Sequence, residues 1–348
     1  MRSQGSSEET SDKSGVAELI NALRPTRSSW AFYLEVMALV KKIVGEKLPS
    51  QCHIAEFGSV PLRTNLPDSE LDLTILCGDE VFEKDCYKVV QEALEQAPEA
   101  RNVRIVEIQQ AKVVKCQVRG MRVCLCFNHI SGLRKLRFLE EMDRFIKKDS
   151  VLKKSLLLIK AWCRYEASIL DAEIGLSSHA LDVMVLYVFN VHHRDLTHMT
   201  PLEVLHKFLS LFSRFDLHRC CLTLTGRVHL IPGYCPEMPD FDENMLLPLH
   251  SISNYNCLTE TKKPFHTAMN VMEPLNPSEN LCSNIADAGN IKNAFMRGKV
   301  WLKSIMKTGN REEFDQFFVK TWSMVQVKPH EENLLSVEAN RSGCELAV

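Results

Sequence analysis

Two carboxylates spaced two residues apart, Glu70 and Asp72, are the side chains of this sequence best placed for chemistry. They lie in the segment ELDLTIL, residues 70–76, in which polar and apolar residues alternate as along a half-buried strand. Side chains two residues apart share one face of a strand, so both carboxylates point the same way while Leu71 and Leu73 enter the core. Two adjacent acids make a hard oxygen site that suits Mg²⁺ carrying a triphosphate.

A Gly-Ser pair, Gly58 and Ser59, ends an earlier strand that the sequence predicts over residues 51–57. Gly58 would let the backbone approach a phosphate closely, and Ser59 would offer an N–H and a hydroxyl at the start of a helix. An ordinary turn is the alternative explanation. The pair therefore indicates either a phosphate contact or a simple change of chain direction.

The elements that must position these residues change character near Leu133, where the apolar period changes from two residues to 3.6. Before that point, a helix with its N-cap at Ser28 or Ser29 and a second helix over residues 83–96 accompany a series of strands. The predicted strands span residues 51–57, 70–76, 103–108, 112–118 and 121–127. The predicted later helices span residues 136–146, 151–165, 179–191, 202–212, 291–306 and 314–322. Residues 226–282 hold most of the later prolines and predict a long irregular connection.

These patterns predict an α+β protein, in which a mixed β-sheet domain precedes a mainly helical domain. Two domains also agree with a length of 348 residues at about 150 residues per domain. We expect the sheet domain, with its leading helix, over residues 15–148 and the helical domain over residues 149–328. The polar ends, residues 1–14 and 329–348, predict a disordered and a flexible tail.

The composition is that of a globular chain, with 45% hydrophobic and 25% charged residues. Its 42 lysine and arginine residues against 44 acids give a net charge of −2, which excludes a general polycationic coat for nucleic acid. The 13 cysteines include no Cys-x-x-Cys spacing, and the first residues form no apolar leader. We therefore expect reduced thiols in a cytoplasmic or nuclear protein. We expect no membrane contact, since no apolar run reaches about 18 residues without a charge.

The stretch FGSVPLRTNLPDSELDLTIL, residues 57–76, resembles the signature of the nucleotidyltransferase superfamily, which includes poly(A) polymerases, terminal uridylyltransferases and oligoadenylate synthases. The resemblance continues along residues 30–320 and is closest to plant-type proteins with a poly(A) polymerase/oligoadenylate synthase substrate-binding domain. The matching segments, in order, are FGSVPL, LPDSELDLT, CFNHISGL, FLEEMDRFI, LLLIKAWCRYE and GLSSHALDVMVLYVF. The resemblance implies a nucleotidyltransferase-fold sheet domain, a helical substrate-binding domain, and template-independent addition of AMP or UMP to RNA 3′ ends.

In the family, three carboxylates on adjacent strands hold two Mg²⁺ or Mn²⁺ ions that orient a nucleoside triphosphate and activate the RNA 3′-hydroxyl. The resemblance places the first two carboxylates on Glu70 and Asp72 and the third on Cys124, where relatives have aspartate. A thiol is mostly protonated at neutral pH and is a soft ligand, and glutamate at the first position is one methylene longer than the family's aspartate. We therefore expect a catalytically impaired protein without a metal cofactor. The alternative is an active enzyme whose Glu70 and Asp72 hold Mg²⁺ or Mn²⁺ without a third acid.

The resemblance also implies nucleotide binding by Gly58, Ser59, Lys160, Ser178, His179 and Asn280. Lys160 matches the helix lysine that reaches the triphosphate, with a snorkelling surface lysine as the alternative. Ser178 and His179 stand where relatives have serine or threonine before a base-stacking tyrosine, in an alignment that allows a shift of one residue. Asn280 remains from a nucleotide-recognition loop over residues 273–282, in which Glu273 replaces aspartate, Glu279 replaces asparagine and Cys282 replaces glycine, changes that weaken the expected affinity.

The implied partners are a nucleoside triphosphate and an RNA 3′ end, and an impaired protein could use its surface for a protein partner instead. A basic cluster near the domain junction favours an RNA-backbone track and a solvated helix face equally. The cluster consists of Arg134, Lys135, Arg137, Lys147, Lys148, Lys153 and Lys154.

Overall fold

The computed structural model describes residues 15–78, 85–108, 111–146, 149–171, 174–192, 199–224, 226–230 and 267–326. Both predicted tails, residues 1–14 and 329–348, lie outside this part of the chain. Residues 23–141 form one compact unit, and the described residues on either side of that stretch form a second. In the described residues, no helix combines the length and apolarity needed to cross a membrane.

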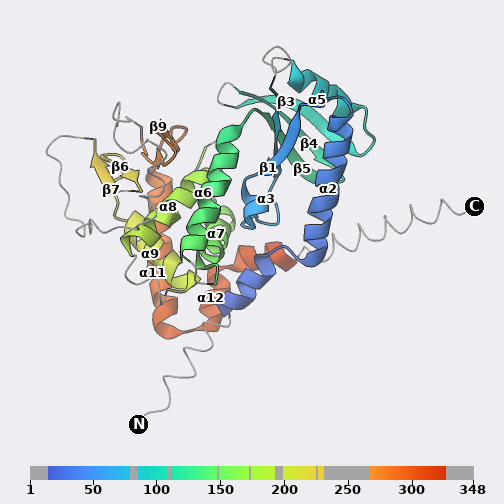
Figure 1. Ribbon diagram of the computed structural model, residues 1–348. Coiled ribbons are helices and arrows are strands. Elements are labelled where there is room, and N and C mark those ends of the chain that lie inside the picture. Colours follow the sequence, from blue (N-terminus) through green and yellow to red (C-terminus); the bar gives the residue numbers. More distant parts are fainter. Residues whose placement is uncertain are drawn as a thin grey trace, which may run out of the picture. The chain divides into compact units, whose positions relative to one another are not determined.

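The unit of residues 23–141 contains a five-stranded mixed sheet in the order β1-β2-β5-β4-β3 (Figure 1). Its strands are β1 His53–Phe57, β2 Leu71–Leu76, β3 Ala100–Ile108, β4 Ala111–Val118 and β5 Met121–Phe127. β2 and β5 run parallel, whereas the other neighbouring strands run antiparallel. The five predicted strands are therefore confirmed, with boundaries shifted by at most a few residues.

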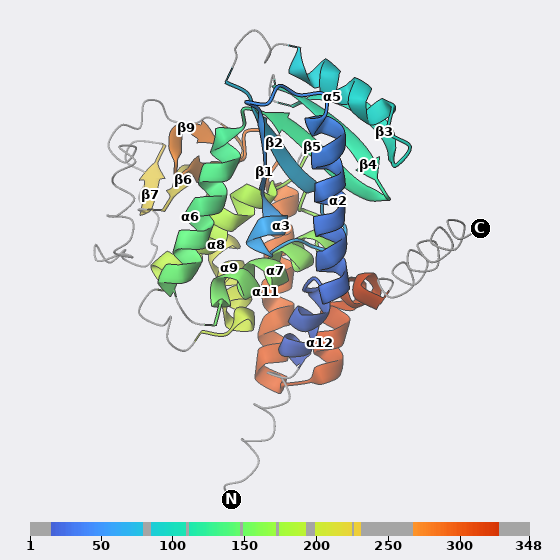
Figure 2. The same cartoon turned by 45° about the vertical axis from the view of Figure 1, so that its right-hand side comes forward.

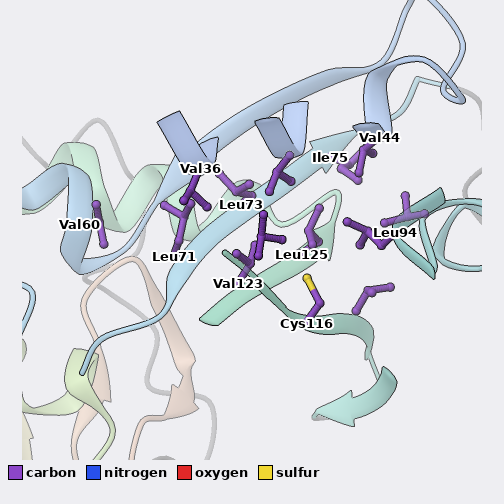
Figure 3. Packing of buried hydrophobic residues seen from close by; sticks show 14 of the residues in the cluster. Val36, Val44, Val60, Leu71, Leu73, Ile75, Leu94, Cys116, Val123 and Leu125 are labelled. Carbon is purple, nitrogen blue, oxygen red and sulfur yellow. The ribbon is translucent and has the colours of Figure 1, made fainter. Parts of the chain in front are cut away.

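Helices α2 (Arg27–Gly45) and α5 (Cys86–Glu95) pack on one face of this sheet. The buried residues of α2, Tyr33, Val36, Val40 and Val44, recur every three or four positions, as the inward stripe of an amphipathic helix does. Figure 3 shows Val36 and Val44 beside strand residues of the same core. Those strand residues include Leu71, Leu73, Ile75, Val123 and Leu125. Because strand side chains alternate, the residues between them face away from this core.

The predicted start of α2 is wrong by two to three residues, because Thr26 and not Ser28 or Ser29 is the N-cap. Thr26 Oγ1 accepts a hydrogen bond from the Ser29 N–H at 3.0 Å, and Ser29 Oγ accepts one from the Thr26 N–H at 3.1 Å. This reciprocal pair is a capping box, with serine in place of the usual glutamate or glutamine. Because Thr26, Ser28 and Ser29 all carry a hydroxyl group, the sequence alone does not show which of them is the N-cap.

The second unit is mainly helical, which confirms the α+β class. The chain passes between the units within α6. α6 spans Ile130–Ile146, and the helices of the second unit include α7 Val151–Ala161, a π-helical turn Trp162–Glu166, α8 Ser178–Val191, α9 Pro201–Phe212, α11 Gly289–Thr308 and α12 Arg311–Phe317. α9 contacts α7, α8 and α11 (Figures 1 and 2). α8 is buried on every side from Ala180 to Asn190, so it forms the centre of this unit.

The predicted irregular connection over residues 226–282 is wrong at both ends, where short strands occur. β6 (Cys220–Thr223) pairs with β7 (Gly226–His229), and β8 (Met272–Glu273) pairs with β9 (Asn276–Asn280). Strands of two to five residues are too short to show an alternating pattern, and the prolines around them indicate a loop instead. Residues 231–266 of this segment lie outside the described part of the chain.

Candidate functional site

The pairing of β2 with β5 brings the predicted metal residues together. Asp72 and Cys124 are aligned partners in this parallel pair, and Glu70 immediately precedes β2 on the same face as Asp72. A carboxylate oxygen of each acid and the Cys124 Sγ all lie within 4.8 Å of one another. The three residues that the resemblance assigned to the metal positions therefore form one cluster.

Cys124 occupies the third position of this cluster, and its side chain points towards Glu70 and Asp72. The residue is only 6% exposed. Within the described ranges, no other set of three or more histidine, cysteine, aspartate and glutamate side chains is as tightly grouped. Asp68, the nearest alternative acid in sequence, is not part of the group, and its backbone carbonyl accepts a hydrogen bond from the Arg122 guanidinium. A thiol thus stands where a third carboxylate was expected.

Gly58 closes one side of the cluster and cannot be replaced without strain. Its φ of +79° is a backbone conformation that residues with a Cβ rarely adopt. A Cβ at this position would lie 2.6 Å from Asp72 Oδ2, well inside van der Waals contact. The helix α3 (Ser59–Leu62) begins directly after it, as predicted for Ser59. The Gly-Ser pair therefore starts a helix beside the acids and is more than a simple turn.

Hydrogen bonds at the ends of β2 and β5 fix the register of the two strands. The Asn128 N–H donates to the Ile75 carbonyl at 2.9 Å, and the Asn128 side-chain oxygen accepts from the Cys77 N–H at 2.8 Å. The His129 N–H donates to Thr74 Oγ1 at 3.0 Å. These contacts hold the strands so that Asp72 stays opposite Cys124.

A lysine that sequence reasoning missed, Lys115 on β4, completes the cluster. It is the cross-strand partner of Cys124, and its Nζ lies 3.3 Å from Glu70 Oε2. The burial of Val114 and Cys116 on the opposite face is a signal that Lys115 points towards the acids. Only the β4–β5 register, however, puts it beside Cys124. The protein thus supplies its own positive charge next to the first acid.

Burial and the neighbouring charges perturb both other members of the cluster. Burial, with a smaller contribution from the Glu70 carboxylate, raises the pKa of Asp72 to about 7, although the Lys115 ammonium acts in the opposite direction. A hydrogen bond with the thiol of Cys126, two residues along the same face of β5, and burial raise the pKa of Cys124. Cys124 is therefore a neutral thiol at physiological pH.

This set of donors does not fit Mg²⁺. Magnesium demands near-octahedral coordination by oxygen, whereas one of the three ligand positions here is a protonated sulfur. The Glu70 carboxylate is also engaged by the Lys115 ammonium. Of the three residues in the cluster, only Asp72 is the aspartate that the family resemblance implies at its position.

Lys160 lies in the helical unit, where α7 and α8 pack together. It is 2% exposed, so the alternative of a snorkelling surface lysine is wrong. Its Nζ lies 2.7 Å from Oδ1 of Asp182, which is also buried. A buried charge of this kind persists only when it is paired. Contact of Lys160 with a triphosphate stays a prediction.

His179 and the predicted nucleotide-recognition loop lie side by side, although 94 residues separate them in sequence. The His179 Nε2 donates to Glu273 Oε2 over 2.6 Å, and Glu273 is 1% exposed. The Leu275 N–H donates to the other Glu273 oxygen at 3.2 Å. Ser178 is the first residue of α8 and is exposed, while the preceding Ser177 is the N-cap. Nucleotide binding by Ser178 and His179 stays a prediction.

The polar atoms of Asn280 are engaged within the chain. Its side-chain oxygen accepts from the N–H groups of Val271 and Cys282, each at 3.0 Å. Its side-chain nitrogen donates to Thr267 Oγ1 at 2.7 Å and to the Met269 carbonyl at 3.1 Å. Asn280 therefore ties the loop of β8 and β9 to its surroundings, and nucleotide binding by this residue stays a prediction.

Ion pairs engage at least three of the seven members of the predicted basic cluster. Arg137 pairs with Glu141 at 2.8 Å, and Lys153 pairs with Asp143 at 3.7 Å. Lys154 pairs with Asp149. Lys147 and Lys148 lie outside the described residues. The RNA-backbone track and the solvated helix face both stay predictions.

Comparison with known proteins places these observations in a family. The family model of the PAP/OAS1 substrate-binding domain matches residues 146–322, just over half of the chain. A comparison with curated protein sequences finds no match.

Among solved structures, Cid1, described for its RNA terminal uridylyl transferase activity, matches with a TM-score of 0.63 and 16% identity, over 87% of this chain and 96% of that one. A cytoplasmic RNA terminal U-transferase matches with a TM-score of 0.63 and 16% identity, over 89% and 98%. The Cid1 poly(U) polymerase with Mg 3′-dATP bound matches with a TM-score of 0.66 and 15% identity, over 87% and 96%. This chain thus has the fold of the RNA terminal nucleotidyltransferases, and it belongs to the PAP/OAS1 substrate-binding domain family.

Proposed function

We propose that this chain is a poly(A)/poly(U) polymerase-like protein in which metal-dependent nucleotidyl transfer is impaired. The observation that carries the proposal is the neutral thiol of Cys124 beside Glu70 and Asp72, in the place of a third carboxylate. The ion pair between Lys115 and Glu70 adds to it, because the ammonium competes with a metal ion for the first acid of the cluster.

The chemical consequence follows from what each side chain can do with a proton and a charge. A neutral thiol neither accepts the proton of an attacking hydroxyl nor balances a second divalent cation. Glu70 is paired with Lys115, so a metal ion must compete with the ammonium for this acid, whereas Asp72 has no such partner among the described residues. Loss of one preorganised electrostatic partner of a transition state costs about 10²–10³-fold in rate.

We also propose that a nucleoside triphosphate and an RNA 3′ end remain the ligands of this fold. The neighbouring structures include Cid1 with MgGTP and Cid1 with its short product ApU. In this chain Gly58 and Ser59, where the family resemblance implies a phosphate contact, lie beside Asp72. An impaired protein of this kind would act by binding RNA or a protein partner.

The second candidate is an active enzyme that adds AMP or UMP to RNA with Mg²⁺ or Mn²⁺. It is favoured by Asp72, which stands on β2 beside the Gly-Ser turn as the family pattern requires. This candidate needs a metal ion to displace Lys115 from Glu70 and to work without a third carboxylate.

A primer-extension assay separates the two candidates. Each of the four nucleoside triphosphates is offered with an RNA primer to the wild type and to the double variant Glu70→Asp/Cys124→Asp, with Mg²⁺ or Mn²⁺. We expect the double variant to extend the primer at least about 100-fold faster than the wild type. Adding Asp72→Asn to either protein should abolish extension, which serves as the matched control. Wild-type extension at the rate of the double variant would establish the active enzyme.

A further inference from the structure

The cluster that does not fit Mg²⁺ has the donor set of a different kind of metal site. One sulfur and two carboxylate groups converge within 4.8 Å, and the sulfur belongs to a side chain that is 6% exposed. Sulfur ligands favour thiophilic cations, and tetrahedral Zn²⁺ accepts cysteine, aspartate and glutamate together. We infer that Glu70, Asp72 and Cys124 form a site for a thiophilic divalent cation, Zn²⁺ above all. The inference concerns the residues of the proposed function and rests on their assignment to one cluster.

The spacing of the ligand atoms suits such an ion after small movements. With Zn–S of about 2.3 Å and Zn–O of about 2.0–2.2 Å, tetrahedral ligand atoms stand about 3.5 Å apart. The observed limit of 4.8 Å exceeds this by little more than 1 Å, which rotation of the Glu70 side chain can supply. Three protein ligands leave the fourth position open to water or a phosphate oxygen.

The lack of a polar partner for the Asp72 carboxylate, within the described residues, is a second observation that points to a cation. In the part of the chain that the structure describes, the Asp72 carboxylate makes no hydrogen bond or ion pair, although Gly58 and Cys124 crowd it. Desolvated carboxylates are costly unless they are paired or bound to metal. A divalent ion would satisfy Asp72 and take Cys124 as a thiolate, with the thiol proton released to solvent.

Lys115 competes with this ion for the Glu70 carboxylate. Its ammonium lies 3.3 Å from Glu70 Oε2, and the side chains of Lys115 and Glu70 are 28% and 30% exposed. Metal binding must move it away from Glu70, which the partial exposure permits. Replacing Lys115 by methionine removes the competitor but leaves all three ligands in place, so this variant should bind metal more tightly.

The test is a titration of the purified full-length chain with Co²⁺, a spectroscopic substitute for Zn²⁺. We expect about one Co²⁺ per chain to give a thiolate-to-cobalt charge-transfer band that Zn²⁺ removes and that a large excess of Mg²⁺ does not. Cys124→Ser should lose the band, whereas Cys116→Ala, which removes a buried thiol from the opposite face of the sheet, should retain it. Lys115→Met should tighten Co²⁺ binding about tenfold or more.

Two results would overturn the inference. One is a band of unchanged intensity in Cys124→Ser, which would assign the thiolate to another of the 13 cysteines. The other is unchanged affinity in Lys115→Met, a variant that keeps every ligand and so does not depend on the folding of Cys124→Ser. Primer extension is a separate measurement, so failure of the impaired-transfer proposal would leave the cobalt result standing, and the reverse also holds.

Discussion

The buried ion pair between Lys160 and Asp182 yields the sharpest stability prediction. The two charges lie 2.7 Å apart between α7 and α8, and the side chains are 3% and 7% exposed. Replacing Asp182 by alanine leaves an ammonium in the interior with its main counter-charge removed. Breaking a buried pair in this way costs about 3–5 kcal/mol, because the remaining charge has lost its compensation.

The assay is urea unfolding followed by circular dichroism, with a double variant as the control. Asp182→Ala should lower the free energy of unfolding by about 3–5 kcal/mol, and Lys160→Met/Asp182→Leu should recover most of that loss. For a unit of about 200 residues, each kcal/mol corresponds to about 2–4 °C in Tm. Asp182→Leu alone is the matched single variant, since it fills the same space as the double variant but keeps the Lys160 ammonium. Greater stability of the double variant than of Asp182→Leu separates a lost charge partner from a packing defect.

Two outcomes would contradict this account of Lys160. A loss below about 1 kcal/mol in Asp182→Ala would show that the ammonium reaches water or another acid. A double variant as unstable as Asp182→Leu would show that packing, and not charge compensation, explains the loss.

Two further substitutions test the geometry of the site and of the recognition loop. Gly58→Ala should destabilise the protein by about 1–3 kcal/mol more than Gly120→Ala in urea unfolding. Both glycines have positive φ, but only the Cβ at position 58 would meet Asp72. Equal losses would mean that the close approach to Asp72 does not affect the free energy of unfolding. Asn280→Ala should cost about 1–3 kcal/mol in the same assay, since it leaves the Val271 and Cys282 N–H groups without acceptors. An unchanged free energy of unfolding in Asn280→Ala would contradict the role of this side chain in holding the loop.

Much of the sheet unit could be predicted from local patterns. The segment of residues 70–76 alternates, so its strand, its buried leucines and the shared face of Glu70 and Asp72 follow from the period of two. The family resemblance then placed Cys124 beside them, which the strand register confirms. The place of Lys115 in the cluster was not predicted, because its position beside Cys124 depends on which residues pair across β4 and β5. Register is a property of two strands and the turn between them, and no single segment carries it.

The helical unit shows a different limit. The pattern LLLIKAW predicts a helix but does not tell whether its lone lysine faces water or the core. A signal was present in α8, where Asp182 is likewise the lone charge in an apolar run, because two isolated opposite charges in buried helices indicate a pair. Likewise, the contact of His179 with Glu273 joins segments 94 residues apart, which only tertiary packing decides.

The most direct test of the central claim is hard-metal binding at the cluster, measured by titration with Mn²⁺ followed by electron paramagnetic resonance. The titration is made with a non-hydrolysable nucleoside triphosphate on the wild type and on Glu70→Asp/Cys124→Asp, with the Asp72→Asn variant of each as the control. We expect Mn²⁺ binding that is at least about tenfold tighter in the double variant and that depends on Asp72. Equal, Asp72-dependent binding by the wild type would show that a thiol at position 124 does not impair the metal centre.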